Sequence, residues 1–116
     1  FIFIRPERYT YEFIEKNDML TLSFLGSGNR SIYNICGSKS GRDTDKIKES
    51  GLLTLTTPDG NVTFEQARLT LECRKLYGQL LSPEHFIDKS LPDKWYGAQG
   101  NFHKVYVVEI LKVWEK

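Results

Sequence analysis

The chain has 116 residues, of which 40% are hydrophobic and 27% are charged, a composition that is typical of one globular domain and excludes a disordered or fibrous chain. Lysine and arginine together number 16, against 15 acidic residues, so the formal net charge is only +1. Because this balance gives no general attraction to nucleic acid or to an anionic membrane, we expect neither partner, and any anion-binding site must be local.

The chain opens with an apolar strand and a short helix. Residues 1–4 are apolar throughout and predict a buried strand. Because the sequence enters this strand at once and without a Met, we expect residues to be missing before it. Thr10 is the expected N-cap of a helix that ends near residue 17 and buries Phe13 and Ile14.

A second strand and two short helices follow. Residues 30–35 predict a helix that Gly37 should end. A polar loop at residues 38–43 leads to a further helix at residues 45–49. Residues 19–25, which precede these helices, alternate in polarity as a strand does. The expected core face of this strand holds Leu20, Leu22 and Phe24.

The second half of the chain contains the longest strand pattern. Residues 52–56 predict a strand that leads into a turn at residues 58–61. Residues 67–80 alternate as a half-buried strand does, with a helix as the competing interpretation. Residues 103–114 are dense in β-branched and aromatic residues and predict the last strand. A helical turn and a loop separate these two strands, at residues 82–87 and 91–101.

These elements predict a mainly β fold with short helices. Five strands, tight turns and small intervening helices are typical of a β-barrel with helical decoration. The sequence shows no repeat and no internal linker, so we interpret residues 1–116 as a single domain that is incomplete at its N-terminus.

The cysteines and the apolar segments set further expectations. Cys36 and Cys73 form no CxxC pair and no zinc pattern with either histidine, so no metal site is expected. We interpret both as reduced thiols in a cytoplasmic protein, with one disulfide as the alternative. No apolar run has the length that a membrane span needs.

Two segments offer the donors that a phosphate group requires, and the first is Arg8-Tyr9-Thr10. A helix start supplies free N–H groups and the positive end of the helix dipole, to which Thr10 adds a hydroxyl and Arg8 a guanidinium. The residues alone favour a plainer interpretation, in which Thr10 caps its own helix and Arg8 is solvated.

The second segment runs from Ser38 to Lys46. Ser38, Ser40 and the glycine at position 41 allow a ligand to approach the backbone closely, and Arg42 and Lys46 supply positive charge. A solvated loop of mixed charge is an equal alternative, because two aspartates partly cancel the cations. The GxxxxGK[ST] spacing of a nucleotide-binding loop is absent.

Other catalytic chemistry is weakly represented in the sequence. No Ser-His-Asp arrangement and no HExxH motif is recognisable. We interpret His85 as a surface turn residue and His103 as a polar group at a strand end. Several aromatic residues offer rings that can stack on a planar ligand, although such rings more often pack in the core: Tyr9, Tyr11, Tyr77, Trp95 and Tyr96.

The order of several segments carries a family resemblance. The most specific segment, at residues 36–46, reads Cys-Gly-Ser-Lys-Ser-Gly-Arg-Asp-Thr-Asp-Lys. Supporting segments extend the likeness over nearly the whole chain, at residues 5–10, 21–24, 71–77 and 103–110. Together they resemble the flavin reductase-like FMN-binding family.

The resemblance implies a split β-barrel that binds FMN near the interface of a homodimer. It implies contacts to the FMN phosphate or ribityl group from Arg8, Thr10 and Lys46. The same cofactor-binding segments contain Tyr9, Ser38, Ser40 and Arg42.

The resemblance also provides one candidate catalytic residue. His103 corresponds to a histidine that precedes the last strand in this family, near the flavin or nicotinamide site. The sequence departs from the family pattern at two neighbouring positions, because Phe102 stands where Asp or Tyr is common and Val108 stands where Gly is frequent.

The implied activity is that of an NAD(P)H-dependent flavin reductase. Hydride would pass from NAD(P)H to FMN, and electrons would pass on to a small-molecule acceptor. The alternatives are an FMN-binding electron carrier without NAD(P)H activity and a split-barrel module that binds a ligand or partner without catalysis.

Overall fold

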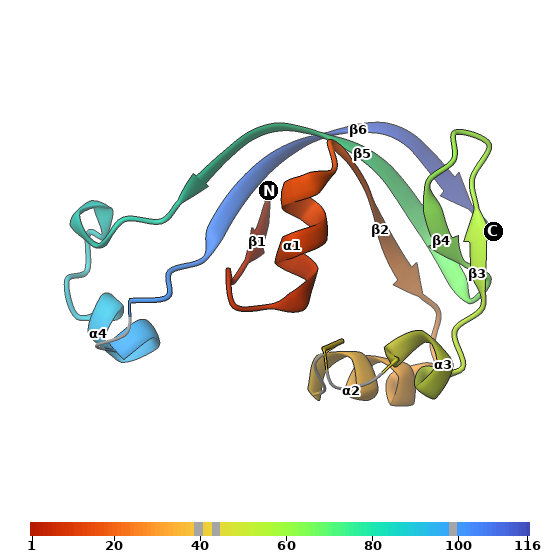
Figure 1. Ribbon diagram of the computed structural model, residues 1–116, viewed down its shortest axis with the longest axis horizontal. Helices are drawn as coiled ribbons and strands as arrows, with labels where there is room; N and C mark the ends of the chain where they lie inside the picture. Colours follow the sequence, from red (N-terminus) through yellow and green to blue (C-terminus); the bar gives the residue numbers. More distant parts are fainter. Residues whose placement is uncertain (39–40, 43–44, 98–99) are drawn as a thin grey trace.

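The computed structural model describes residues 1–38, 41–42, 45–97 and 100–116, and the described chain is mainly β with short helices, as predicted (Figure 1). The strands are β1 (Ile2–Ile4), β2 (Met19–Leu25), β3 (Thr54–Thr56), β4 (Val62–Phe64), β5 (Ala67–Leu80) and β6 (Lys104–Glu115). The helices are α1 (Tyr9–Lys16), α2 (Arg30–Ser38), α3 (Lys46–Ser50), the 3₁₀ turn η1 (Pro83–His85) and α4 (Leu91–Tyr96).

Two long strands form the frame of the molecule. The main sheet has the order β1-β6-β5-β2, and all its neighbouring strands are antiparallel. β5 and β6 pair from Leu69↔Glu115 to Leu80↔Lys104, with irregularities between Glu72 and Cys73 and between Lys75 and Tyr77. Because a bulge bends and twists the strand that carries it, the pair curves over the other elements as an arch (Figure 1). The sheet therefore curls as one half of a barrel would.

Helix α1 lies beneath this arch and is attached to it through its last turns (Figure 1). The Lys75 Nζ donates to the carbonyl oxygen of Ile14 at 2.6 Å. Lys104 Nζ donates to Glu15 Oε1 at 2.7 Å, and the Tyr106 hydroxyl donates to the same oxygen. Tyr106 is only 2% exposed, and its burial raises the pKa of its hydroxyl. These contacts fix both the position and the direction of the helix.

A buried carboxylate attaches the β3–β4 hairpin to the two long strands. Glu72 is 1% exposed and accepts hydrogen bonds from the Thr57 hydroxyl, from Asn61 Nδ2 at 2.9 Å and from Trp114 Nε1 at 2.7 Å. The bond from Thr57 is the main cause that holds the pKa of Glu72 below its usual value, against the opposing effect of burial. The carboxylate is therefore ionised, and three donors stabilise its charge.

The burial of the strands differs from the sequence expectation. Phe24, placed on the core face, is 44% exposed, whereas Thr70 and Glu72 are buried. The β3–β4 hairpin covers the face of the sheet that carries the polar side chains. There the Ser23 and Thr63 hydroxyls lie 3.1 Å apart, and those of Thr63 and Thr70 lie 2.7 Å apart. Hydroxyls that bond one another can be buried without an unsatisfied group.

Two expectations for α1 are wrong. Its N-cap position is occupied by Arg8, and no side chain caps the helix, so that Thr10 lies inside the first turn. Phe13 was expected to be buried and is 51% exposed.

Other predicted boundaries are confirmed or corrected by the structure. The helix predicted to stop at Gly37 continues to Ser38, and residues 91–96 form α4 instead of a loop. The strand β4 was not predicted. The helix predicted at residues 45–49 is confirmed as α3: Asp45 accepts from the backbone N–H of Lys48 at 3.2 Å, and Gly51 ends the helix in the left-handed region at φ 80°.

Within the part of the chain that the structure describes, both cysteines are free thiols, as predicted. None of the helices described has the length and apolar character that would let it cross a membrane.

We predict that Glu72→Gln lowers the free energy of unfolding by about 1–3 kcal/mol at neutral pH, because an amide N–H₂ would face one of the three donors. Urea unfolding followed by circular dichroism measures this difference. The folded-state pKa of Glu72 is lowered, so its contribution is present above the ordinary pKa of 4.5 and is lost as the pH falls below it. The gap between wild type and variant should therefore narrow in acid.

Glu109→Gln provides the matched control, because its carboxylate pairs with Arg74 at 2.9 Å on the exposed surface. Such pairs contribute less than about 1 kcal/mol. A Glu72→Gln protein as stable as the Glu109→Gln protein would contradict the structural role of Glu72.

Candidate functional site

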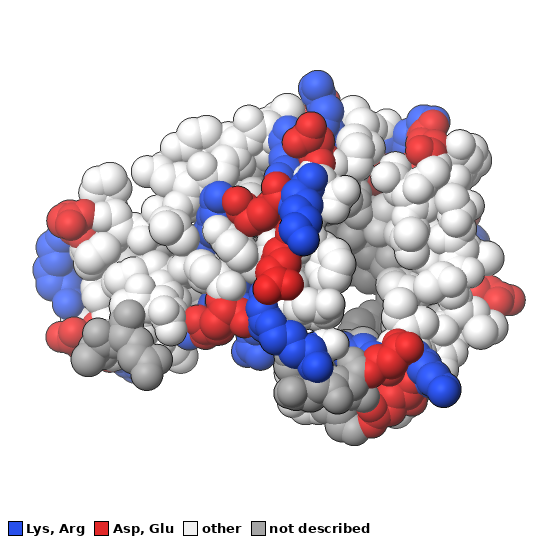
Figure 2. All heavy atoms as spheres, in the orientation of Figure 1, with Lys and Arg blue, Asp and Glu red and all other residues white. Residues whose placement is uncertain are grey.

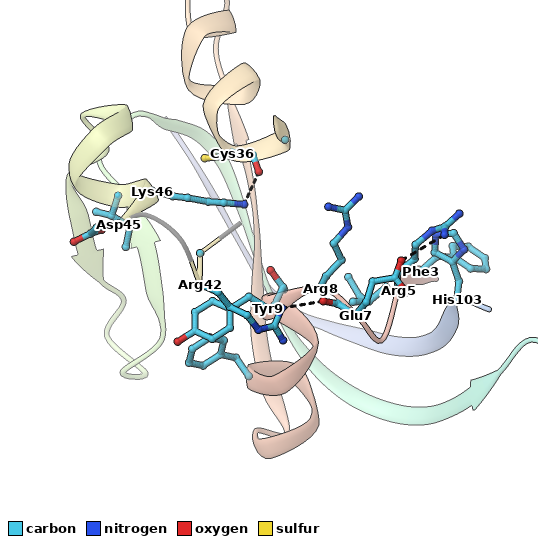
Figure 3. A pocket seen from close by; sticks show the side chains of 16 residues that line it. Phe3, Arg5, Glu7, Arg8, Tyr9, Cys36, Arg42, Asp45, Lys46 and His103 are labelled. Atoms are coloured by element: carbon cyan, nitrogen blue, oxygen red, sulfur yellow. Dashed lines mark hydrogen bonds and ion pairs between the residues drawn. The ribbon is translucent and has the colours of Figure 1, made fainter. Parts of the chain in front are cut away.

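A cleft of about 1200 Å³ opens beside the start of α1. Its walls come from three parts of the chain that are distant in sequence (Figure 3): the β1–α1 segment, the end of α2 with the start of α3, and the residue before β6. The side chains that line it include Arg5, Glu7, Arg8, Tyr9, Thr10, Phe13, Cys36, Arg42, Asp45, Lys46 and His103.

Lys46 joins the two short helices on one side of the cleft. It is the first residue of α3, which Asp45 caps, and its Nζ donates to the carbonyl oxygen of Cys36 in α2 at 2.6 Å. An ammonium group has three N–H donors. Lys46 therefore holds the end of α2 in place with one donor and retains others for an anion in the cleft.

Arg8 lies where α1 begins, and Figure 3 shows its side chain extending into the cleft. Among the residues that the structure describes, no hydrogen-bond or ion-pair partner of its guanidinium is found. The first N–H groups of an α-helix lack the usual partner one turn earlier; in α1 the N–H of Tyr11 donates to the carbonyl oxygen of Arg8 at 3.1 Å, and no side chain caps the start of the helix. The uncapped helix start and the guanidinium together form a local site for an anion.

Arg42, in contrast, is bound to α1. Its NH1 donates to the carbonyl oxygen of Glu7 at 2.9 Å, and its NH2 pairs with Glu12 Oε1 at 3.0 Å. The guanidinium carbon lies 5.2 Å from the centroid of the Tyr9 ring, a cation–π distance. Arg42 thus fastens the segment after α2 to the start of α1.

Gly41 passes directly over the Tyr9 ring. A Cβ atom at position 41 would lie 2.6 Å from Tyr9 Cδ2, which is closer than two carbon atoms can approach. The ring has little freedom to move, because Tyr9 and Phe13 pack edge to face with centroids 4.9 Å apart. The glycine permits a contact that no other residue would allow without movement.

A histidine and a tyrosine meet at the other end of the cleft. The Tyr96 hydroxyl lies 2.7 Å from Nδ1 of His103, and the guanidinium carbon of Arg5 lies 5.1 Å from the Tyr96 ring centroid. Burial is the main cause that lowers the pKa of His103, Arg5 and Arg8 lower it further, and Glu7 opposes them. His103 is therefore neutral at physiological pH.

The cleft carries an excess of positive charge although the chain as a whole is nearly neutral, as expected for a local anion-binding site. Its lining holds the cations Arg5, Arg8, Arg42 and Lys46 against the carboxylates Glu7 and Asp45. Elsewhere the charges alternate in sign: Figure 2 shows cationic and acidic side chains interspersed in a band across the middle of the molecule, over α1.

Most residues that the sequence selected meet in this cleft. Its lining includes Arg8, Tyr9, Thr10, Arg42, Lys46 and His103. Ser38 is not part of the lining; its hydroxyl donates to the carbonyl oxygen of Asn34 at 2.6 Å, within α2. Ser40 lies outside the described residues, as does much of the segment between α2 and α3.

Two residues of the site were not selected as such from the sequence. Arg5 carries positive charge to the His103 end of the cleft. The usable signal was its place three residues before Arg8 and directly after β1, a strand that was predicted to be buried but in which Phe3 is 55% exposed. Tyr96 was considered only as a stacking ring, because its segment was predicted as a loop. No signal in the sequence indicated its contact with His103.

No group of three or more His, Cys, Asp or Glu side chains in the described ranges is arranged to hold a metal ion. The cleft therefore presents positive charge and N–H donors at one end and a neutral histidine at the other.

Comparison with known proteins gives a family match and a set of solved structures. The family model described as "Flavin reductase like domain" matches residues 1–116. No curated protein matches the chain.

Three of the similar structures represent the set. An FMN-binding protein from Thermus thermophilus is 22% identical with a TM-score of 0.72, over 99% of this chain and 53% of that chain. Flavoredoxin from Methanosarcina acetivorans is 20% identical, with a TM-score of 0.70, over 99% and 51%. A candidate flavin reductase with a split barrel domain from Shewanella frigidimarina is 17% identical, with a TM-score of 0.72, over 99% and 50%.

These structures confirm the predicted split-barrel fold. The chain spans about half the length of each of them, which agrees with a curled sheet that forms half of a barrel.

We predict that Gly41→Ala lowers the free energy of unfolding by about 1–3 kcal/mol, the usual cost of overpacking. The new methyl group would displace the Tyr9 ring and disturb its packing with Phe13 and Arg42. Thermal and urea unfolding measure the loss. Gly26→Ala is the control, because a Cβ at position 26 meets nothing within 4 Å.

A double-mutant cycle identifies the cause. If the Tyr9 ring is responsible, Gly41→Ala should cost almost nothing in a Tyr9→Ala background. An equal cost in both backgrounds would show that the contact with Tyr9 is not what requires a glycine.

Proposed function

The chain belongs to the flavin reductase-like domain family, and we propose that it binds FMN in the cleft and acts as an NAD(P)H-dependent flavin reductase. The observation that carries the proposal is the convergence of Arg8, Lys46 and the uncapped start of α1 on one cleft. When bound, FMN supplies the redox chemistry, accepting hydride and passing electrons on; the protein binds it and controls its surroundings.

The side chains of the cleft fit the phosphate end of FMN. A phosphate dianion requires several convergent donors and positive charge. Arg8 has a guanidinium without a partner in the described chain, Lys46 has further N–H donors, and the Thr10 hydroxyl and backbone N–H lie in the uncapped first turn of α1. We assign these three residues to the phosphate and the adjoining ribityl hydroxyls.

The remaining cleft residues have supporting roles in this proposal. Arg42 is held by Glu7, Glu12 and Tyr9, so we assign it to the support of the binding segment and not to direct contact. The Tyr9 and Phe13 rings form an apolar part of the wall, which suits a planar ring system. His103 is the residue proposed to meet the reacting end of the ligand.

We also propose that the protein acts as a homodimer in the cytoplasm, with a small-molecule electron acceptor and without nucleic acid or a membrane as partners. Exposed apolar side chains on the long strands support a covering partner. Ile110 and Val113 are both exposed, although their cross-strand partners are Cys73 and Leu71. Apolar surface of this kind is usual where a further chain packs.

A second candidate function is that of an FMN-binding electron carrier. Flavoredoxins from Methanosarcina acetivorans and Desulfovibrio vulgaris share the fold of this chain. A carrier needs the same phosphate site but makes no use of NAD(P)H.

We predict that the purified chain turns yellow when FMN is added and stays yellow after the excess FMN has been removed. The FMN-loaded protein should then oxidise NADH or NADPH under air faster than free FMN at the same concentration. Absorbance at the nicotinamide and flavin bands measures both events. Consumption of NAD(P)H at the rate of free FMN, together with electron transfer from the chemically reduced protein to an acceptor, would favour the carrier. A protein that stays colourless would contradict both functions.

A further inference from the structure

The His103 end of the cleft contains a side-chain pair whose role goes beyond binding a phosphate. Figure 3 shows His103 beside Arg5, across the cleft from Lys46. His103 immediately precedes β6, and Tyr96 is the last residue of α4. Their side chains meet with the tyrosine oxygen 2.7 Å from Nδ1, and the two rings pack edge to face with centroids 5.6 Å apart and an interplanar angle of 76°.

Tyr96 is held in place independently of this hydrogen bond. Its ring packs against Phe102 with centroids 4.4 Å apart and against Phe86 at 6.4 Å. Arg5 lies over the ring with its guanidinium carbon 5.1 Å from the centroid, and it also donates to the carbonyl oxygen of Trp95 at 3.3 Å. The hydroxyl of Tyr96 is thus fixed before any ligand binds, which is the condition for orienting another side chain.

The chemistry of the pair indicates which atom carries the proton. A neutral imidazole has one nitrogen that donates and one that accepts, and the partner of one nitrogen decides the state of the other. The groups that surround His103 are Arg5, Arg8, Glu7 and Tyr96, and their balance with burial keeps the ring neutral. A cation over the Tyr96 ring withdraws electron density from the phenol, which makes its hydroxyl a better donor and its oxygen a poorer acceptor.

We propose that Tyr96 is a positioning residue, which donates to Nδ1 of His103 and fixes the neutral ring with its proton on Nε2. The Nε2–H is then the group that His103 offers to a ligand, and it suits a carbonyl oxygen or another uncharged acceptor. The ligand part of this proposal, in which the Nε2–H of His103 donates to an acceptor on a bound ligand, rests on the proposed function, because a flavin ring and a nicotinamide both carry carbonyl oxygens. The state of the ring itself does not depend on that function.

The test is ¹⁵N NMR of the histidine rings in the ligand-free chain at neutral pH, in wild type and in Tyr96→Phe. The chain has only two histidines, so His85 serves as an internal reference. We expect one tautomer for wild-type His103, with Nδ1 unprotonated, and a loss of this preference in Tyr96→Phe, which keeps the ring but removes the hydroxyl. A wild-type ring protonated on Nδ1 would overturn the proposal, and so would an unchanged pattern in the variant.

A matched control separates this effect from the general loss of a tyrosine hydroxyl. Tyr33→Phe removes the hydroxyl that accepts from the backbone N–H of Leu25 at 2.8 Å, in a different part of the molecule. It should leave the His103 spectrum unchanged. A Tyr33→Phe protein with the same altered His103 signals would show that the effect is not specific to Tyr96.

Addition of FMN then separates this proposal from the proposed function. A shift of the His103 Nε2–H signal in wild type that is lost in Tyr96→Phe supports the ligand part. Tight FMN binding without any change at His103 overturns the ligand part while the proposed function stands. Failure of wild type to bind FMN overturns the proposed function, whereas the ligand-free spectra still decide the role of Tyr96.

Discussion

The attachment of α1 to the long strands determines where the cleft has its positive end. An eight-residue helix is not stable by itself in water, so contacts with the sheet have to set its position. Lys75 binds the Ile14 carbonyl, and Lys104 and Tyr106 bind Glu15. These donors hold the C-terminal half of α1, where a cation also balances the helix dipole. The N-terminal half, which no side chain caps, lines the cleft.

The other side of the cleft depends on contacts between residues that are distant in the sequence. Lys46 joins α3 to α2 through the Cys36 carbonyl, and Arg42 joins the intervening segment to α1 through Glu7 and Glu12. The two cations have different consequences for a ligand. Lys46 keeps N–H donors that face the cleft, whereas the guanidinium of Arg42 binds Glu7 and Glu12 of the protein itself. Lys46 and Arg42 come from the same stretch of sequence, and we propose that the first binds the ligand whereas the second supports the site.

The accuracy of the sequence predictions depended on how local each signal was. The strand at residues 67–80 was predicted with its observed bounds, and α3 was predicted from Asp45 and Gly51, because period and capping are properties of neighbouring residues. The burial of Glu72 was not predictable, since its three donors come from other elements. The segments around Arg8 and Lys46 were found from charge and family resemblance, but the partner of His103 lies on a helix that was not predicted.

The most direct test of the account compares the binding of FMN with that of riboflavin, which lacks the phosphate. We expect wild type to bind FMN more tightly, and Arg8→Ala and Lys46→Ala each to weaken FMN binding by about 1.5–3 kcal/mol, the range of hydrogen bonds to charged groups, with little effect on riboflavin. Arg68→Ala and Lys48→Ala are the matched controls, because both residues are exposed and neither lines the cleft. Unchanged FMN affinity in Arg8→Ala and Lys46→Ala, or equal losses for both ligands, would contradict a phosphate site at the start of α1.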